Sequence, residues 1–412
     1  MATFEDDFKT QMKLQDLKEL ISTQDLSSAI NTIKKYLDQQ DFVELNVAVT
    51  GESGSGKSTF VNAFRGLKND DEGSAETGEI ETTMNPEVYL HPKYNNVKVW
   101  DLPGIGTPNF KADEYLEKVE FERYDFFIII ASDRFKECHT QLAKEIVRMR
   151  KKFYFVRTKI DSSIKAAKRK KTFELKKTLD AIREDCEKGL IDIPKEGPVV
   201  FLISGWKLGK YDFNLLQERM EEELPQHKRR VLMLALPNIT HEINEKKKKS
   251  LEENIGKVAF LSACMATIPV PGLSFAVDLA IIARELKKYY SAFDLDDQSL
   301  QLLSERSGKP VEELKSLMKS PLRHGINQDA ILTLLKTSLL TMSLSVAEYV
   351  VSLIPIIGSV AAGGISYYTV SIMLRKALND IAEDAGNMLM ASLETGVNFN
   401  LEMRNLKTVL TF

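Results

Sequence analysis

The chain has 412 residues, of which 43% are hydrophobic and 28% charged, and this composition is typical of a globular protein with room for two domains. The formal net charge of −3 disfavours a nucleic-acid binder, because neutralising phosphates requires a basic surface. The scattered cysteines and histidines show no metal-ligand spacing, so they indicate neither a zinc site nor a His-based nucleophile, and the sparse cysteines suit a reducing compartment.

Residues 1–40 are predicted to form two short helices, because apolar residues recur at helical spacing. From Leu45 to about Leu224, short runs rich in Val, Ile and Phe alternate with longer amphipathic segments. The runs are LNVAVT, NVKVW, DFFIIIA, FYFVRT and VVFLIS. Such nearly continuous apolar runs are typical of parallel strands buried on both faces. The alternation therefore predicts a mostly parallel, doubly wound α/β sheet.

The segment GESGSGKS follows the first of these strands and precedes a helix-competent stretch, which is the context that a phosphate-binding loop requires. Small residues let successive backbone N–H groups converge on phosphate oxygens, and the next helix adds partial positive charge. We expect Lys57 to reach the β- and γ-phosphates and the Ser58 hydroxyl to ligate Mg²⁺. The predicted phosphate-binding residues are Gly51, Glu52, Ser53, Gly54, Ser55, Gly56, Lys57, Ser58 and Thr59.

A second motif, Thr158-Lys159-Ile160-Asp161, follows a later strand and distinguishes the base. The Asp161 carboxylate can accept hydrogen bonds from the ring N–H and exocyclic amine of guanine. Adenine would leave it unpaired, at a cost of roughly 1–3 kcal/mol. The stem of Lys159 can cover one face of the base. Ser204 and Gly205 of the segment FLISGWK are predicted to contact the base as well, and the predicted ligand is GTP or GDP.

The segment VKVWDLPGIGT supplies Asp101, which can hold Mg²⁺ through water, and the Gly104 N–H, which can sense a γ-phosphate. The acidic segment 69–89 is the predicted switch that closes on the γ-phosphate and Mg²⁺. Its threonines Thr77, Thr82 and Thr83 are the candidate metal ligands, and Thr83 is favoured, although the pattern alone does not fix the choice.

Ile105 follows Gly104, at a place where small regulatory GTPases carry a water-positioning Gln. An apolar side chain cannot orient water, so either turnover is very slow or the catalytic group comes from elsewhere. One hypothesis is self-assembly, in which two nucleotide faces meet and Glu79 or Glu81 polarises the water. The alternative for these glutamates is solvated loop charge. The predicted catalytic residues are Lys57, Glu81, Thr83 and Gly104.

After LPNIT at residues 236–240 the strand pattern ends and a charged helical stretch follows. Two similar apolar segments, residues 258–286 and 345–378, each contain an Ile-Pro-x-x-Gly break and are predicted helical hairpins. Each half is shorter than the roughly 20 residues of a spanning helix, and Asp278 and Glu348 lie inside these segments. The alternatives are a buried helical core and a re-entrant hairpin that inserts into a membrane.

The sequence resembles the immunity-related GTPases, the interferon-inducible family distantly similar to dynamins. The resemblance covers most of the chain, and the blocks YDFFIII and FYFVRTK are more specific than the GTPase motifs. It implies a Ras-like P-loop G domain at residues 41–235 and an all-α helical domain built from residues 1–40 and 236–412. It also implies GTP hydrolysis, nucleotide-dependent self-assembly, related GTPases as partners, and action at intracellular membranes in innate immunity.

Members of that family divide by whether Lys or Met precedes the Ser of the phosphate loop, and Lys57 is typical of the Lys-bearing type. Several members begin Met-Gly and are myristoylated, whereas this sequence begins Met-Ala. The resemblance therefore implies a cytoplasmic protein that reaches endo- or vacuolar membranes peripherally, through its helical domain. The alternative function is a slow-turnover guanine-nucleotide switch that recruits partners without significant hydrolysis.

Overall fold

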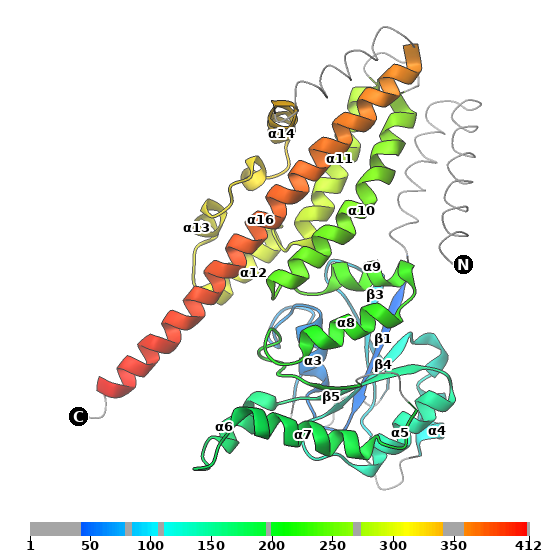
Figure 1. Ribbon diagram of the computed structural model, residues 1–412, viewed down its shortest axis with the longest axis vertical. Helices are drawn as coiled ribbons and strands as arrows, with labels where there is room; N and C mark the ends of the chain where they lie inside the picture. The colour runs from blue at the N-terminus through cyan, green and yellow to red at the C-terminus, as the bar shows by residue number, and fades with distance from the viewer. Residues whose placement is uncertain are drawn as a thin grey trace. The chain divides into compact units, whose positions relative to one another are not determined.

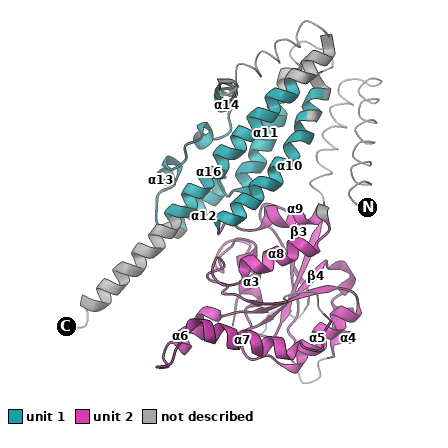
Figure 2. Cartoon of the chain, viewed as in Figure 1, with its two compact units in different colours: residues 1–40, 240–412 teal, residues 41–239 magenta. Residues whose placement is uncertain are grey.

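The computed structural model describes residues 43–78, 85–105, 111–194, 199–266, 273–340 and 358–409. It combines a mostly parallel sheet flanked by helices with a set of long helices toward the C-terminus (Figure 1). The chain divides into two compact units, one covering residues 41–239 and the other described from residue 240 on (Figure 2). The helices predicted for residues 1–40 lie outside the described residues.

The sheet has six strands in the order β2-β3-β1-β4-β5-β6. They are β1 (Leu45–Gly51), β2 (Glu87–Leu90), β3 (Val97–Asp101), β4 (Phe126–Ala131), β5 (Lys152–Arg157) and β6 (Val200–Leu202). β2 runs antiparallel to β3, and the other neighbouring strands are parallel. The predicted α/β class is thus confirmed. The sequence reasoning missed β2, because most of its side chains are exposed and it has no buried apolar run.

Helices cover both faces of this sheet, as the continuous apolar strands require. In β4 every residue is buried, and since side chains alternate between faces, both faces must be covered. On one face, Phe127 and Ile129 pack with Leu142 and Ile146 of α5. The helices of this unit are α3 (Lys57–Phe64), α4 (Ala112–Lys118), α5 (Glu137–Arg148), α6 (Ile160–Ala167), α7 (Leu175–Gly189), α8 (Phe213–Glu223) and α9 (Gln226–Ala235), with a 3₁₀ turn, η1 (Phe121–Arg123).

β1 lies between β3 and β4, so the strand order reverses at its carboxyl end. In open α/β sheets, ligands bind outside the carboxyl ends of the strands at such a switch point. The segments that follow β1, β3 and β5 therefore meet where a ligand is expected.

The second unit consists of helices packed side by side. They are α10 (His241–Ala266), α11 (Leu273–Ala292), α12 (Asp297–Ser307), α13 (Val311–Ser316), α14 (Gln328–Leu340) and α16 (Gly358–Val409), with a 3₁₀ turn, η2 (Pro321–His324). α10 packs along α16 and α11. The charged stretch that opens α10 is not wholly solvated, because Lys247 is buried and its ammonium donates to the carbonyl of Ala292 at 2.6 Å. This cation therefore caps the C-terminus of α11.

The described parts of the two apolar segments pack as a helical core. Asp278 of α11 accepts hydrogen bonds from Ser262 of α10 and, at 3.0 Å, from Ser366 of α16. Burial raises the pKa of Asp278, and the two serine hydrogen bonds oppose that rise. The predicted hairpin tips, together with Glu348, lie outside the described residues. Within the described ranges, no helix combines the length and the apolar run needed to cross a membrane.

Candidate functional site

The predicted phosphate loop joins β1 to α3 at the switch point of the sheet. Gly51 has φ 150°, and a Cβ there would lie 2.1 Å from the carbonyl oxygen of Ile130, so no side chain fits. Gly56, at the start of α3, has φ 93° in the left-handed region that favours glycine. These two positions explain why the turn from β1 into α3 needs glycine.

Inside this loop, polar groups are held away from solvent. Lys57 is only 8% exposed, and its ammonium donates to the carbonyl oxygens of Gly51 at 3.3 Å and Glu52 at 3.1 Å. The Ser55 hydroxyl is buried and has no hydrogen-bond partner among the described residues. Ser53 and Gly54 are exposed. In this loop the ammonium of Lys57 therefore bonds to backbone carbonyls of the loop itself, and the Ser55 hydroxyl has no partner among the described residues.

Ser58 and Asp101, the two described residues predicted to hold Mg²⁺, lie next to each other. The Ser58 hydroxyl donates to Oδ2 of Asp101 at 2.9 Å. The other oxygen of Asp101, Oδ1, is buried without a hydrogen-bond partner among the described residues. Burial raises the pKa of Asp101, while the Ser58 hydrogen bond and the charge of Lys57 oppose that rise. A hydroxyl beside an orphaned carboxylate oxygen is a donor set that suits a hard cation such as Mg²⁺.

The segment after β5 is fastened to the phosphate loop by two hydrogen bonds. The Thr158 hydroxyl donates to the carbonyl of Ser55 at 2.6 Å, and the Lys159 ammonium donates to the carbonyl of Gly54 at 2.9 Å. Lys159 itself has φ 54°, and α6 begins at the next residue. The structure therefore brings the two predicted binding motifs into direct contact.

Asp161 and the segment after β6 are similarly linked. The buried Ser204 hydroxyl donates to Oδ1 of Asp161 at 3.0 Å. A Cβ on Gly205 would lie 3.0 Å from Cγ2 of Thr59, so this glycine also closely approaches α3. The phosphate loop, the segment after β5 and the segment after β6 thus converge at one edge of the sheet.

The segment after β3 continues toward the phosphate loop. The amide of Leu102 donates to the carbonyl of Val49 at 2.9 Å, and the amide of Ile105 donates to that of Gly51 at 3.1 Å. Ile105 is buried. The residue after Gly104 is therefore an apolar side chain packed in the core. Of the predicted switch residues, Thr77 is exposed, whereas Glu79, Glu81, Thr82 and Thr83 lie outside the described residues.

Sequence reasoning missed the residues that support these loops. The Asn62 side chain exchanges two hydrogen bonds with the backbone of Ala75, at 2.6 and 2.9 Å. Arg65 donates to the carbonyls of Gly73 and Leu90. The buried Tyr115 hydroxyl bonds to the carbonyl of Pro103. These partners are 8 to 25 positions apart in the chain and form no recognised motif, so the sequence pattern did not identify them.

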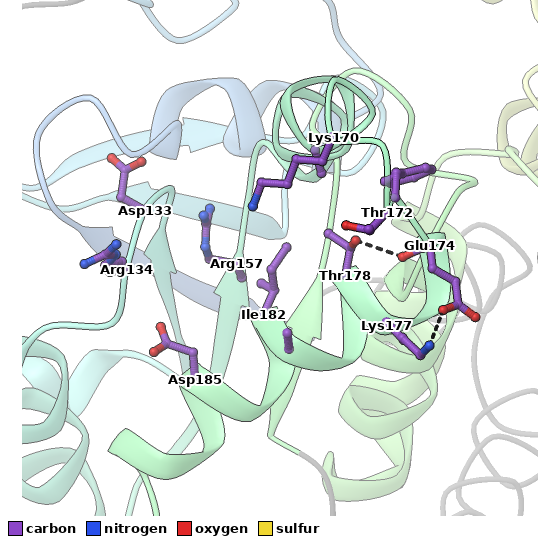
Figure 3. A pocket seen from close by; sticks show the side chains of 13 residues that line it. Asp133, Arg134, Arg157, Lys170, Thr172, Glu174, Lys177, Thr178, Ile182 and Asp185 are labelled. Atoms are coloured by element: carbon purple, nitrogen blue, oxygen red, sulfur yellow. Dashed lines mark hydrogen bonds and ion pairs between the residues drawn. The ribbon is translucent and has the colours of Figure 1, made fainter.

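A separate hollow of about 520 Å³ lies beside α7 in the same unit (Figure 3). Arg157 and Lys170 line it together with Asp185, and its rim carries the ion pair between Lys177 and Glu174. None of the predicted nucleotide-binding residues lines this hollow. It is therefore distinct from the site at the switch point.

A doubly wound sheet with a phosphate loop at its switch point, fastened to a Thr-Lys-x-Asp loop, defines the chain as a P-loop protein of the guanine-nucleotide-binding class. The model of the interferon-inducible GTPase family (IIGP) matches residues 10–391. The chain belongs to this family, and it is a GTPase.

Curated relatives agree with this assignment. Interferon-inducible GTPase 5 of Bos taurus is 41% identical over 384 residues, covering 93% of this chain and 82% of the relative. Interferon-gamma-inducible GTPase 10 of Mus musculus is 40% identical over 329 residues, covering 78% and 79% of the two chains. Interferon-inducible GTPase 1 of Mus musculus is 41% identical over 297 residues, covering 72% and 71%.

Proposed function

We propose that the chain binds GTP and GDP at the switch point and hydrolyses GTP there. In this assignment the phosphate-loop amides and Lys57 hold the phosphates. The Asp161 carboxylate accepts hydrogen bonds from the ring N–H and exocyclic amine of guanine. Ser204 orients that carboxylate, and Lys159 covers one face of the base. The observation that carries the proposal is the convergence of the loops, fastened by the hydrogen bond from Thr158 to Ser55 and that from Ser204 to Asp161.

Mg²⁺ is the cofactor that this arrangement suits. Ser58 and Asp101 would hold it, Asp101 through water, with Thr83 of the switch as a further ligand. The support is the buried, unpartnered Oδ1 of Asp101 beside the Ser58 hydroxyl. When bound, such an ion offsets negative charge on the phosphate oxygens. In this proposal the backbone N–H of Gly104 donates a hydrogen bond to the γ-phosphate.

We further propose that hydrolysis depends on self-assembly of copies of this chain through their nucleotide faces. Ile105 is buried and apolar, so it cannot orient a water molecule. The polarising group then has to come from another segment, and Glu81 or Glu79 of the switch is the candidate. On this proposal the protein, alone or with related GTPases, acts at intracellular membranes in innate immunity; the name of its family, interferon-inducible GTPase, supports the immune role.

The alternative is a guanine-nucleotide switch that recruits partners with negligible turnover, and the buried Ile105 is the observation that favours it. GTP hydrolysis per molecule, measured over a hundredfold range of protein concentration, separates the two. Self-assembly predicts that turnover per molecule rises with concentration. A flat, very low rate at every concentration would contradict the assembly proposal and leave the switch. Lys57→Ala controls for the site, because it should remove nucleotide binding while circular dichroism stays unchanged.

Membrane action needs its own measurement. Co-sedimentation with liposomes is to be compared with GTP, with GDP and without nucleotide. Nucleotide-dependent sedimentation would support the proposal, whereas equal and negligible sedimentation in all three conditions would contradict it.

A further inference from the structure

Three side chains at the phosphate loop have no role in the proposed nucleotide chemistry, in which Glu52 takes part only through its backbone amide. They are Glu52 of the loop and Cys138 and His139 in the first turn of α5. Their carboxylate oxygen, thiol sulfur and ring nitrogen all lie within 4.8 Å of one another. Because Glu52 and Cys138 are 86 positions apart in the chain, motif spacing gives no sign of this cluster.

The distance between the first two ligand atoms matches a metal site. The Cys138 thiol donates a hydrogen bond to Oε1 of Glu52, with the sulfur and oxygen atoms 3.7 Å apart. A tetrahedral zinc ion, with bonds of about 2.3 Å to sulfur and about 2.0 Å to oxygen, would place these two atoms roughly 3.5 Å apart. The Lys136 ammonium also contacts Oε1, at 2.8 Å. The second oxygen, Oε2, makes no hydrogen bond or ion pair with the described residues.

His139 supplies an independent reason to expect a ligand. Its side chain is fully buried, and its Nδ1 accepts a hydrogen bond from the Lys136 amide at 3.1 Å. Its Nε2 is buried without a hydrogen-bond partner among the described residues. Buried polar atoms in native proteins almost always have partners. A partner for this nitrogen is therefore expected from outside the described residues. The rings of Phe135 and Phe155 pack edge-on against the imidazole and fix its position.

We propose that Glu52, Cys138 and His139 bind a divalent cation of the zinc class, with water in the fourth position. A thiolate, an imidazole and a carboxylate together favour zinc over Mg²⁺ or Ca²⁺, which prefer oxygen ligands. Three protein ligands and one water form an open tetrahedral site.

Binding rearranges protons and one ion pair. The Cys138 thiol releases its proton to solvent as sulfur bonds to the metal. His139 binds through one ring nitrogen and keeps its single N–H proton on the other, so in either case Nδ1 no longer accepts the hydrogen bond from the Lys136 amide. The Lys136 ammonium leaves Glu52, since the cation takes its place. The bound ion would then tie the phosphate loop to the start of α5.

The test is a titration of the full, nucleotide-free chain with Zn²⁺, followed by calorimetry, so its outcome does not depend on the proposed GTP chemistry. Wild-type protein should bind Zn²⁺ at this site, and Cys138→Ala should weaken that binding by at least about tenfold. Glu52→Gln, which keeps the side-chain shape, should also weaken it. Co²⁺ in place of Zn²⁺ should give a thiolate-to-metal absorption band in wild type that Cys138→Ala lacks.

Matched controls are Cys186→Ala, which removes a buried thiol of the same unit, and His227→Asn, which removes an exposed imidazole. Both should bind Zn²⁺ as wild type does. The proposal is overturned if Cys138→Ala binds Zn²⁺ as tightly as wild type, if either control weakens binding equally, or if the Co²⁺ complex shows no thiolate band. Circular dichroism of each variant is to be compared with that of the wild type, to check that the variant is folded.

Discussion

The hydrogen bond from the Thr158 hydroxyl to the carbonyl of Ser55 should contribute more to the unfolding free energy than an exposed hydrogen bond of the same kind. It is buried, and it joins the base-binding segment to the phosphate loop. Both groups are buried, and the oxygen atoms lie 2.6 Å apart. Thr158→Val keeps the shape of the side chain and removes the donor. The carbonyl of Ser55 has no other hydrogen-bond partner among the described residues, so the substitution would leave it buried and unpaired.

The expected loss follows from the cost of an unsatisfied buried acceptor, which is about 1–3 kcal/mol. A control comes from Thr178 of α7, whose hydroxyl donates to the carbonyl of Glu174 at an exposed position. In Thr178→Val, water can replace the lost donor at that carbonyl. The same chemical change should therefore alter the unfolding free energy there by less than about 0.5 kcal/mol.

Urea unfolding followed by tryptophan fluorescence measures this difference. Trp100 and Trp206 are the two tryptophans of the chain, and both lie in the unit formed by residues 41–239, so the signal reports on that unit. Thr158→Val should lower the unfolding midpoint and weaken GDP binding, whereas Thr178→Val should change neither. If Thr158→Val unfolds at the wild-type urea concentration and binds GDP normally, this hydrogen bond does not fasten the two loops.

Three further substitutions test other parts of the structure. Asp161→Asn should reduce the preference for GDP over ADP by at least about tenfold, because the amide cannot accept both guanine hydrogen bonds; competition binding measures this, and an unchanged preference would contradict the role of Asp161. Asp101→Asn should leave GDP binding without Mg²⁺ nearly intact and remove most of the gain that Mg²⁺ gives, and an equal gain in both proteins would refute the metal assignment. Since burial raises the folded-state pKa of Asp278, the stability it contributes is full below its ordinary pKa and is lost as the pH rises through the folded pKa. The melting temperature of wild type minus that of Asp278→Asn should accordingly fall across that range, and a difference that grows with pH would be contrary to expectation.

The parallel core of the fold was predictable because its strands are buried on both faces. A run such as DFFIIIA needs no partner information to be recognised as a strand. β2 was not predictable in this way, since it is short and mostly exposed, and it forms as an edge through antiparallel pairing with β3.

Within the site, local motifs indicated some of the residues, whereas others are recognisable only in the folded chain. Local motifs named Ser58 and Asp101 separately as residues that hold Mg²⁺, and the structure places the two side chains within hydrogen-bond distance. The supports of the site, such as Asn62 and Tyr115, act through partners that only the folded chain brings near. The cluster around His139 arises in the same way, from a loop and a helix start that are distant in sequence.

The central claim is that the switch point binds a guanine nucleotide and rejects adenine. The most direct test is to displace fluorescently labelled GDP from the purified chain with unlabelled GDP or ADP. The account predicts that GDP displaces the label at stoichiometric concentrations while ADP fails even in hundredfold excess. Equal displacement by the two nucleotides would contradict it.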